Sequence, residues 1–188
     1  MTIVQDRISF LEFIRFALPI QNPFCVEIGV LEGNFSRMIL EELTPKWLAL
    51  IDPYMKSEDR YGGVELEMST AYSDSNGYRD LINRFAGAMQ SGTVQVLREF
   101  SHNIVSVFAD KFLHFLYIDG NHKYESVKKD LNDWLPKMQE NSVIAGHDYI
   151  DHPDFGVKQA VNEFMEEHGW EMIIHNSNGG DFALKKIQ

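Results

Sequence analysis

Residues 24–33 read Phe-Cys-Val-Glu-Ile-Gly-Val-Leu-Glu-Gly, and this stretch decides the fold class. The apolar run 24–28 has the length of a strand and is followed directly by a glycine. A helix that ends at Leu43 is expected next, with Asn34 or Ser36 as its capping residue. A strand, a glycine-rich turn and a helix start together allow a ligand to approach the backbone closely.

The same alternation continues along the rest of the chain. Further strands are predicted at 47–51, 93–97, 113–118 and 142–145, and helices at 78–89, 101–108, 126–135 and 157–168. A hairpin is predicted from 170–175 and 181–185, which flank the turn sequence Asn-Ser-Asn-Gly-Gly. Apolar strands that alternate with helices indicate a mostly parallel sheet covered on both faces, so the fold class is a doubly wound, Rossmann-like α/β domain.

Two segments stand outside this alternation. Residues 1–19 contain apolar side chains at helical spacing, which predicts an amphipathic helix over 4–17 that ends before Pro19. Residues 54–77 are polar, contain Gly62-Gly63 and are longer than an ordinary connection, which suits a lid or substrate loop. We find no linker or internal repeat, so residues 1–188 are expected to form a single domain.

Composition and charge limit the classes of partner. The 17 basic and 28 acidic residues give a net charge of −11, which disfavours nucleic acid and anionic membranes as partners. The only cysteine, Cys25, lies in an apolar run and suits a reducing compartment. The sequence contains neither a signal-peptide pattern nor the roughly 20 apolar residues that span a bilayer. A cytoplasmic location and a small-molecule partner are expected.

Two acidic residues at strand ends indicate the ligand. Glu27 belongs to the pattern E-x-G-x-x-x-G, which differs from the G-x-G-x-x-G of nicotinamide enzymes. An acid would be awkward beside a pyrophosphate, but it suits the cationic amino and sulfonium groups of S-adenosylmethionine. Asp52 ends the next strand, where a carboxylate can accept both ribose hydroxyls of an adenosine.

A family resemblance rests on motifs that fall in order along the chain. They are Val-Glu-Ile-Gly-Val-Leu-Glu-Gly, Ile-Asp-Pro-Tyr, Tyr-Ile-Asp-Gly-Asn-His-Lys-Tyr-Glu-Ser-Val-Lys-Lys-Asp-Leu, Gly-His-Asp-Tyr and Gly-Val-Lys-Gln-Ala-Val. Together they resemble the Rossmann-like S-adenosylmethionine-dependent methyltransferases, in the small-molecule branch with cephalosporin-hydroxylase-like and sugar or antibiotic O-methyltransferases. The resemblance covers roughly residue 24 to the C-terminus.

The resemblance implies roles for particular residues. Glu27, Gly29 and Gly33 match the loop under the methionine moiety, and Asp52 matches the ribose-binding acid. Ser101 follows the third strand, near the adenine, and Asp119 matches the acid beside the transferable methyl group. The implied sheet has seven strands in the order 3-2-1-4-5-7-6, with strand seven antiparallel.

The resemblance also implies a metal site and leaves the catalytic base open. Related metal-dependent O-methyltransferases bind a divalent cation through carboxylates at the positions of Asp119 and Asp148, where the metal lowers the pKa of the acceptor oxygens. His147 stands where some relatives have a second acid; carboxylates alone suit magnesium, whereas an imidazole favours manganese, iron or zinc. A general base is also needed, and His122 and His147 both have an ordinary pKa of about 6.5.

Other functions remain open at this point. A metal-dependent hydrolase would use Asp119, His122, His147 and Asp148, and a nicotinamide-dependent oxidoreductase would share the fold class. The favoured reaction is direct methyl transfer from S-adenosylmethionine to a hydroxyl of a small molecule such as a sugar, a phenol or a polyketide-like scaffold. A homodimer is the assembly expected on statistical grounds.

Overall fold

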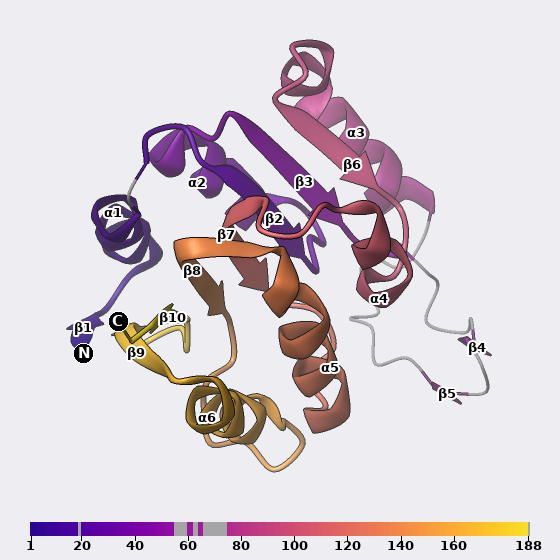
Figure 1. Cartoon of the computed structure of the whole chain (residues 1–188). Coiled ribbons are helices and arrows are strands. Elements are labelled where there is room, and N and C mark those ends of the chain that lie inside the picture. The colour runs from indigo at the N-terminus through magenta and orange to yellow at the C-terminus, as the bar shows by residue number, and fades with distance from the viewer. Residues whose placement is uncertain (19, 55–59, 62–63, 66–74, 188) are drawn as a thin grey trace.

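One mixed eight-stranded sheet organises the protein (Figure 1). The structure, a computed structural model, describes residues 1–18, 20–54, 60–61, 64–65 and 75–187. The strands of this sheet are β1 (Thr2–Val4), β2 (Phe24–Ile28), β3 (Trp47–Ile51), β6 (Val94–Leu97), β7 (Leu113–Ile118), β8 (Met138–Gly146), β9 (Trp170–Asn176) and β10 (Phe182–Lys186). The described helices are α1 (Arg7–Ala17), α2 (Asn34–Leu43), α3 (Ser75–Gln90), α4 (Ser101–Ile104), α5 (Tyr124–Trp134) and α6 (Val157–His168).

The strand order confirms the predicted topology and adds one strand to it. Across the sheet the order is β6-β3-β2-β7-β8-β10-β9-β1, so the seven predicted strands follow 3-2-1-4-5-7-6. β10 runs antiparallel to β8 and β9, and the other neighbours are parallel. The sheet has eight strands rather than seven, because β1 extends it beyond β9.

The N-terminal segment differs from the single helix predicted over 4–17. Residues Thr2–Val4 form β1, which pairs in parallel with Ile174–Asn176 of β9. Asp6 then caps α1, because its carboxylate accepts a hydrogen bond of 2.8 Å from the Ser9 amide. A side-chain cap at this position starts the helix at Arg7, three residues later than the apolar pattern indicated.

Helices cover both faces of the sheet, in agreement with the predicted doubly wound arrangement. Alternate residues of the central strands pack against α1, α2 and α3 on one face, in a core that includes Cys25, Leu50, Phe115 and Tyr117. The neighbouring residues pack against α5 and α6 on the other face, where Trp134 and Phe164 are buried. Burial raises the pKa of the Cys25 thiol, which is expected to be unreactive.

The register of the central strands places their carboxyl ends at one edge of the sheet. Ile28 pairs with both Ile51 and Ile118, and Ile118 pairs with Gly146. The residues that follow these strands, Gly29, Asp52, Asp119 and His147, therefore lie along that edge.

Part of the predicted lid over 54–77 is described by the structure. Arg60–Tyr61 (β4) and Val64–Glu65 (β5) form a two-stranded antiparallel sheet, which Figure 1 shows apart from the main sheet. The predicted helix over 78–89 begins earlier, at Ser75. The other residues of the predicted lid, 55–59, 62–63 and 66–74, lie outside the described part of the chain, so its function stays a prediction. Among the described residues, no helix has the length and apolar character needed to cross a membrane.

Candidate active site

Glu27 is a buried acid in the middle of the sheet. Its side chain is 1% exposed, and burial raises its pKa to about 8 against an opposing effect of the nearby Ser36 hydroxyl. That hydroxyl is buried too, and its geometry does not complete a hydrogen bond to Glu27. The Oε2 atom of Glu27 has no hydrogen-bond partner among the residues that the structure describes. An unpaired buried polar atom is costly, and such atoms are uncommon in folded proteins. The position therefore has an unsatisfied acceptor that suits a hydrogen-bond donor or a cation on a ligand.

The two glycines of the loop are required by packing within the protein. A Cβ atom on Gly29 would lie 1.9 Å from the carbonyl oxygen of Asp119, so β2 and β7 approach each other closely here. A Cβ on Gly33 would lie 2.6 Å from Leu81 and 2.7 Å from Phe85, both on α3. Gly33, with φ +73°, also takes the N-cap position of α2, which we predicted for Asn34 or Ser36.

Asp52 holds the glycine-rich loop in place. Its Oδ2 atom accepts hydrogen bonds from the amides of Val30 (2.9 Å) and Leu31 (3.1 Å), and its Oδ1 atom accepts one from Tyr54 (2.8 Å). The Tyr54 hydroxyl donates to the Leu31 carbonyl at 2.8 Å and joins the two loops a second time. The structure thus gives Asp52 a role inside the protein, and its predicted contact with a ribose remains a prediction.

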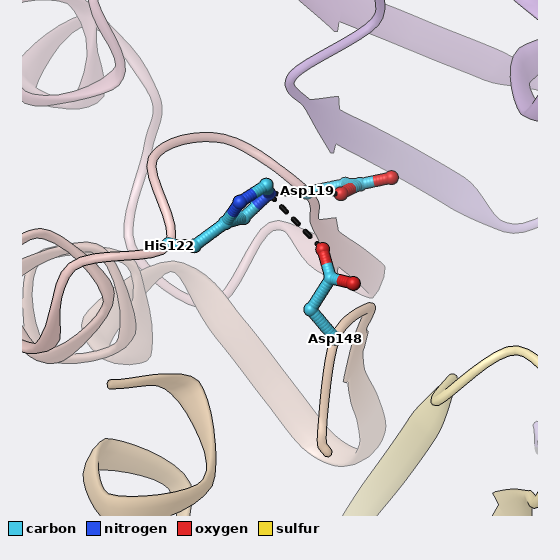
Figure 2. Close-up of side chains that lie close together, drawn as sticks. All are labelled: Asp119, His122 and Asp148. Carbon is cyan, nitrogen blue, oxygen red and sulfur yellow. Dashed lines mark ion pairs between the residues drawn. The ribbon is translucent and has the colours of Figure 1, made fainter. Parts of the chain in front are cut away.

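Four side chains from two loops meet at the ends of β7 and β8. Asp119 follows β7, His122 precedes α5, and His147 and Asp148 follow β8. The Oδ2 atom of Asp148 lies 3.0 Å from His122 Nε2 and 3.1 Å from His147 Nδ1. The Oδ1 atom of Asp119 lies 3.8 Å and 3.7 Å from the same two nitrogens. The sequence predicted this cluster, and Figure 2 shows His122 and Asp148 directed toward each other.

The donor atoms of this cluster are close enough for a metal ion. Potential ligand atoms of Asp119, His122 and Asp148 lie within 4.8 Å of one another. The predicted set contained His147 in place of His122. Because His147 Nδ1 approaches the same two carboxylates, the geometry brings both imidazoles to the site. Two carboxylates and an imidazole form a donor set that suits manganese, iron or zinc better than magnesium.

Electrostatic interactions within the cluster favour the charged forms of its members. Asp119 contributes most to raising the pKa of His122, although Asp148 lies nearer to its Nε2 atom. Burial opposes the charged form of His147, but the hydrogen bond and charge of Asp148, with the charge of Asp119, raise its pKa. Burial likewise opposes ionisation of Asp148, yet contact with the two imidazoles lowers its pKa. Both histidines therefore hold a proton more strongly than a free imidazole does.

The backbone at Asp148 adopts an uncommon conformation. Its φ is +58°, in the left-handed region that non-glycine residues enter rarely, with Asn and Asp among the exceptions. The next residue, Tyr149, donates its amide to the carbonyl of Gly180 at 2.9 Å, which fixes the turn after β8 against the strand hairpin. Backbone strain of this kind is common at functional sites, where surrounding contacts maintain it.

Ser101 lies at the same edge of the sheet but is engaged by another residue. It begins α4, and its hydroxyl donates a short hydrogen bond to Asp130 of α5. Burial raises the pKa of Asp130 to about 6. Asp130 also borders the site, because a Cβ atom on Gly120 would lie 3.9 Å from its Oδ2 atom. The predicted contact between Ser101 and an adenine is untested.

Sequence reasoning missed a second polar cluster beside Glu27. Arg7 Nε lies 3.1 Å from Asp181 Oδ1, and Arg7 Nη2 donates to the Tyr117 hydroxyl at 3.4 Å. Tyr117 donates to Asp181 at 2.6 Å, and the Asn176 amide donates to the same carboxylate at 2.8 Å. One feature of the sequence could have indicated this cluster. Arg7 is a cation in the first turn of a helix, where the positive end of the helix dipole disfavours it, so its position calls for another explanation.

Two surface hollows lie near opposite ends of the sheet. One of about 490 Å³ lies beside the N-terminal helix and Pro23, away from the acidic strand ends. The other, of about 400 Å³, lies between the loop after β8 and α6 and is lined in part by Phe155. Since the Phe155 ring is 4.6 Å from the His122 ring, the second hollow borders the cluster.

Comparison with known proteins adds a family match. A family model described as a methyltransferase domain matches residues 26–149. A Sinorhizobium fredii protein, named uncharacterized protein y4gI, is 33% identical over 90 residues, which are 43% of this chain and 10% of that protein. The chain therefore spans about a tenth of the length of this curated relative.

Solved structures show the same fold. The O-methyltransferase TomG of Streptomyces achromogenes, solved with S-adenosylmethionine, is 16% identical with a TM-score of 0.62, covering 95% of this chain and 78% of TomG. The O-methyltransferase NovP is 18% identical with a TM-score of 0.67, covering 97% and 80%. An rRNA methylase of Streptococcus thermophilus is 12% identical with a TM-score of 0.61, covering 97% and 95%. These proteins act on different kinds of acceptor, small molecules or rRNA by their names, so the fold alone does not decide the acceptor.

Proposed function

This chain belongs to the methyltransferase-domain family, and we propose that it transfers the methyl group of S-adenosylmethionine to a hydroxyl oxygen of a small molecule. When bound, this cofactor supplies an electrophilic methyl group on a sulfonium sulfur, which leaves as a neutral thioether. The family match favours this reaction over the hydrolase and the nicotinamide oxidoreductase that the sequence left open.

The single observation that carries the proposal is the unsatisfied oxygen of Glu27. The residue is buried at the start of the loop that the motif predicts to hold the methionine moiety, and within the described residues its Oε2 atom has no partner. The ammonium group of the cofactor would supply the missing hydrogen-bond donor and a compensating charge. A pyrophosphate would meet a negative or unsatisfied oxygen here, which disfavours a dinucleotide.

The acceptor hydroxyl must lose a proton as its oxygen bonds to the methyl carbon. In its neutral form, His147 is our candidate for the base that accepts this proton, with Asp148 holding the ring through the 3.1 Å contact to Nδ1. His122 is the competing base, since it makes the equivalent contact at 3.0 Å. Positioning of the acceptor in line with the methyl group supplies the rest of the rate enhancement.

The cluster of Asp119, His122 and Asp148 supports a metal-assisted form of the reaction. Its potential ligand atoms lie within 4.8 Å of one another, as a shared cation would require. A divalent cation held there, manganese in preference to magnesium, would lower the pKa of the acceptor oxygen. With His122 used as a ligand, His147 remains available as the base.

A small acceptor suits the charge and shape of the protein. The net charge of −11 disfavours a polyanionic substrate such as RNA. The hollow of about 400 Å³ that borders His122 has the size of a small-molecule site. Its lining includes Asn162, whose side-chain nitrogen can donate a hydrogen bond to a hydroxylated ligand, whereas Lys158 and Gln159 already donate to Asp151 and Glu163.

Calorimetric titration with S-adenosylhomocysteine tests the proposal first. We expect micromolar binding, about −8 kcal/mol, in the folded protein. Titrations with and without manganese or magnesium then reveal whether a metal contributes, and hydroxylated acceptors can be screened under the better condition. A folded protein that binds no S-adenosylhomocysteine would remove methyl transfer as its function.

A further inference from the structure

Arg7 is held rigidly by the protein with part of its guanidinium group left available. Its Nε atom pairs with Asp181, its Nη2 atom donates to the Tyr117 hydroxyl, and its Cζ atom lies 4.8 Å from the centre of the Phe35 ring. The side chain is 30% exposed. In the described part of the chain, no acceptor is bonded to Nη1. The arrangement presents oriented N–H donors to a ligand with little loss of side-chain freedom.

The ion pair with Asp181 leaves Arg7 able to donate hydrogen bonds to a ligand. Asp181 is fully buried, and it also accepts hydrogen bonds from Tyr117 and Asn176. A carboxylate shared among three donors serves as a fixed support for the guanidinium group. Such a support is useful for recognition, because a planar guanidinium in one orientation can bind a second carboxylate with two parallel hydrogen bonds.

The position of Arg7 relates directly to Glu27. Glu27 on β2 and Tyr117 on β7 are register partners, so their side chains lie side by side on the same face of the sheet. Tyr117 is the residue to which Arg7 donates, and Phe35 follows the glycine-rich loop at the start of α2. Arg7 also acts on Glu27 electrostatically and favours its ionised form. A cation and an acid therefore lie close together at the methionine end of the proposed cofactor site.

We propose that Arg7 binds the carboxylate of the cofactor's amino-acid end while Glu27 binds its ammonium group. An α-amino acid carries both charges on one carbon atom, and a site with one acid and one guanidinium recognises that pair. Arg7 is then a specificity-determining residue, which distinguishes the intact cofactor from nucleosides without the carboxylate. This inference rests on the proposed binding of S-adenosylmethionine.

The test compares two ligands that differ only in the carboxylate. Calorimetry should show that the wild-type protein binds S-adenosylhomocysteine roughly 10- to 100-fold more tightly than its decarboxylated analogue, as expected for a charged hydrogen-bonded pair. In Arg7→Ala this preference should fall to about twofold or less, since the remaining contacts are common to both ligands. Arg15→Ala, which changes an arginine at the other end of the same helix, should keep the wild-type preference.

A second variant guards against a folding defect. Arg7→Ala leaves the buried Asp181 without its ion pair, whereas Arg7→Met combined with Asp181→Asn removes both charges together. The double variant should fold, bind the decarboxylated analogue as the wild type does, and lose the preference for S-adenosylhomocysteine. A wild-type protein that binds both ligands equally, or a folded variant that keeps the preference, overturns the role of Arg7 alone. A wild-type protein that binds neither ligand contradicts the proposed function itself.

Discussion

Asp148 Oδ2 lies 3.0 Å from His122 Nε2, and this contact joins the loop after β7 to the loop after β8. Each loop begins where a parallel strand ends, so the sheet sets the separation of the two side chains. The ligand and proton-transfer groups of the proposed reaction thus depend on strand register for their positions. This dependence makes the site suitable for substitutions that change chemistry and leave the fold intact.

Asp148→Asn should abolish most methyl transfer without changing cofactor binding. Asparagine tolerates the left-handed backbone found at this position, so the turn should form, but the charge that orients both imidazoles is lost. We expect kcat to fall by about 10²- to 10⁴-fold, as for the loss of a general acid–base arrangement. Calorimetry should give a dissociation constant for S-adenosylhomocysteine within about twofold of wild type. Asp110→Asn, an exposed acid paired with Lys137 and remote from the proposed acceptor hollow, is the matched control.

The affinity for S-adenosylhomocysteine should increase with pH between 6 and 7.5. Glu27 has a pKa of about 8 in the free protein, so it is mostly protonated in this range, whereas the bound ammonium requires the carboxylate. Binding then releases about one proton and strengthens by about tenfold per pH unit. Calorimetry in buffers of different ionisation enthalpy measures both quantities. A pH-independent affinity would contradict the contact between Glu27 and the ammonium group, and an identical pH profile in Glu27→Gln would assign the linkage to another group.

Glu27→Gln should stabilise the protein near neutral pH while it weakens cofactor binding. The folded-state pKa of about 8 lies above the ordinary value of 4.5, so the folded protein binds the proton more tightly. Protonated Glu27 therefore contributes to the stability of the fold. This contribution is fully present below pH 4.5 and is lost as the pH rises towards 8. A neutral glutamine avoids that loss, which is on the order of 3 kcal/mol at pH 7. Urea unfolding at pH 4.5 and 7 should show a gain at pH 7 alone.

Asp52→Ala should reduce both stability and cofactor affinity. Loss of the carboxylate leaves the amides of Val30, Leu31 and Tyr54 without their acceptor, which should lower the free energy of unfolding by about 1–3 kcal/mol. A comparable loss is expected in the binding of S-adenosylhomocysteine. Its 2′-deoxy analogue separates the two roles: wild type should prefer the ribose form if Asp52 contacts the sugar. Equal binding of both forms would limit Asp52 to holding the loop.

Manganese should bind at the cluster of Asp119, His122 and Asp148. Electron paramagnetic resonance of free Mn²⁺ measures the dissociation constant, which Asp119→Asn should increase by at least about tenfold through loss of an anionic ligand. Asp110→Asn, an exposed acid paired with Lys137, should bind as wild type does. Equal binding in Asp119→Asn would exclude this cluster as the metal site.

Much of the fold could be predicted because its central strands are continuous apolar runs. The predicted bounds of β2, β3 and β7 match the structure, since each run ends at a glycine, aspartate or proline that cannot continue it. β8 begins earlier than predicted, at the buried Met138, because the polar residues 139–141 separate this residue from the apolar run that was recognised. β1 was missed because three residues carry little periodicity and depend on pairing with β9, which is distant in sequence.

The site was predictable where residues follow strands and unpredictable where helices contribute. Asp52, Asp119 and Asp148 were identified because parallel strands bring their carboxyl ends to one edge. The pairing of Arg7 with Asp181 links residues separated by 174 positions, and neither belongs to a sequence motif. The direction of the Asp52 side chain could not be predicted either, since an acidic residue in a turn can accept hydrogen bonds from its own loop or from a ligand.

The hydrogen bonds of Asp52 have a consequence for the kinetics of ligand capture. Because three backbone amides are already fixed, the loop after β2 has its shape before any cofactor arrives. Encounter at this part of the site then requires no slow ordering of the loop. Stopped-flow association should consist of one phase whose rate rises linearly with ligand concentration, without the plateau that a rate-limiting rearrangement produces.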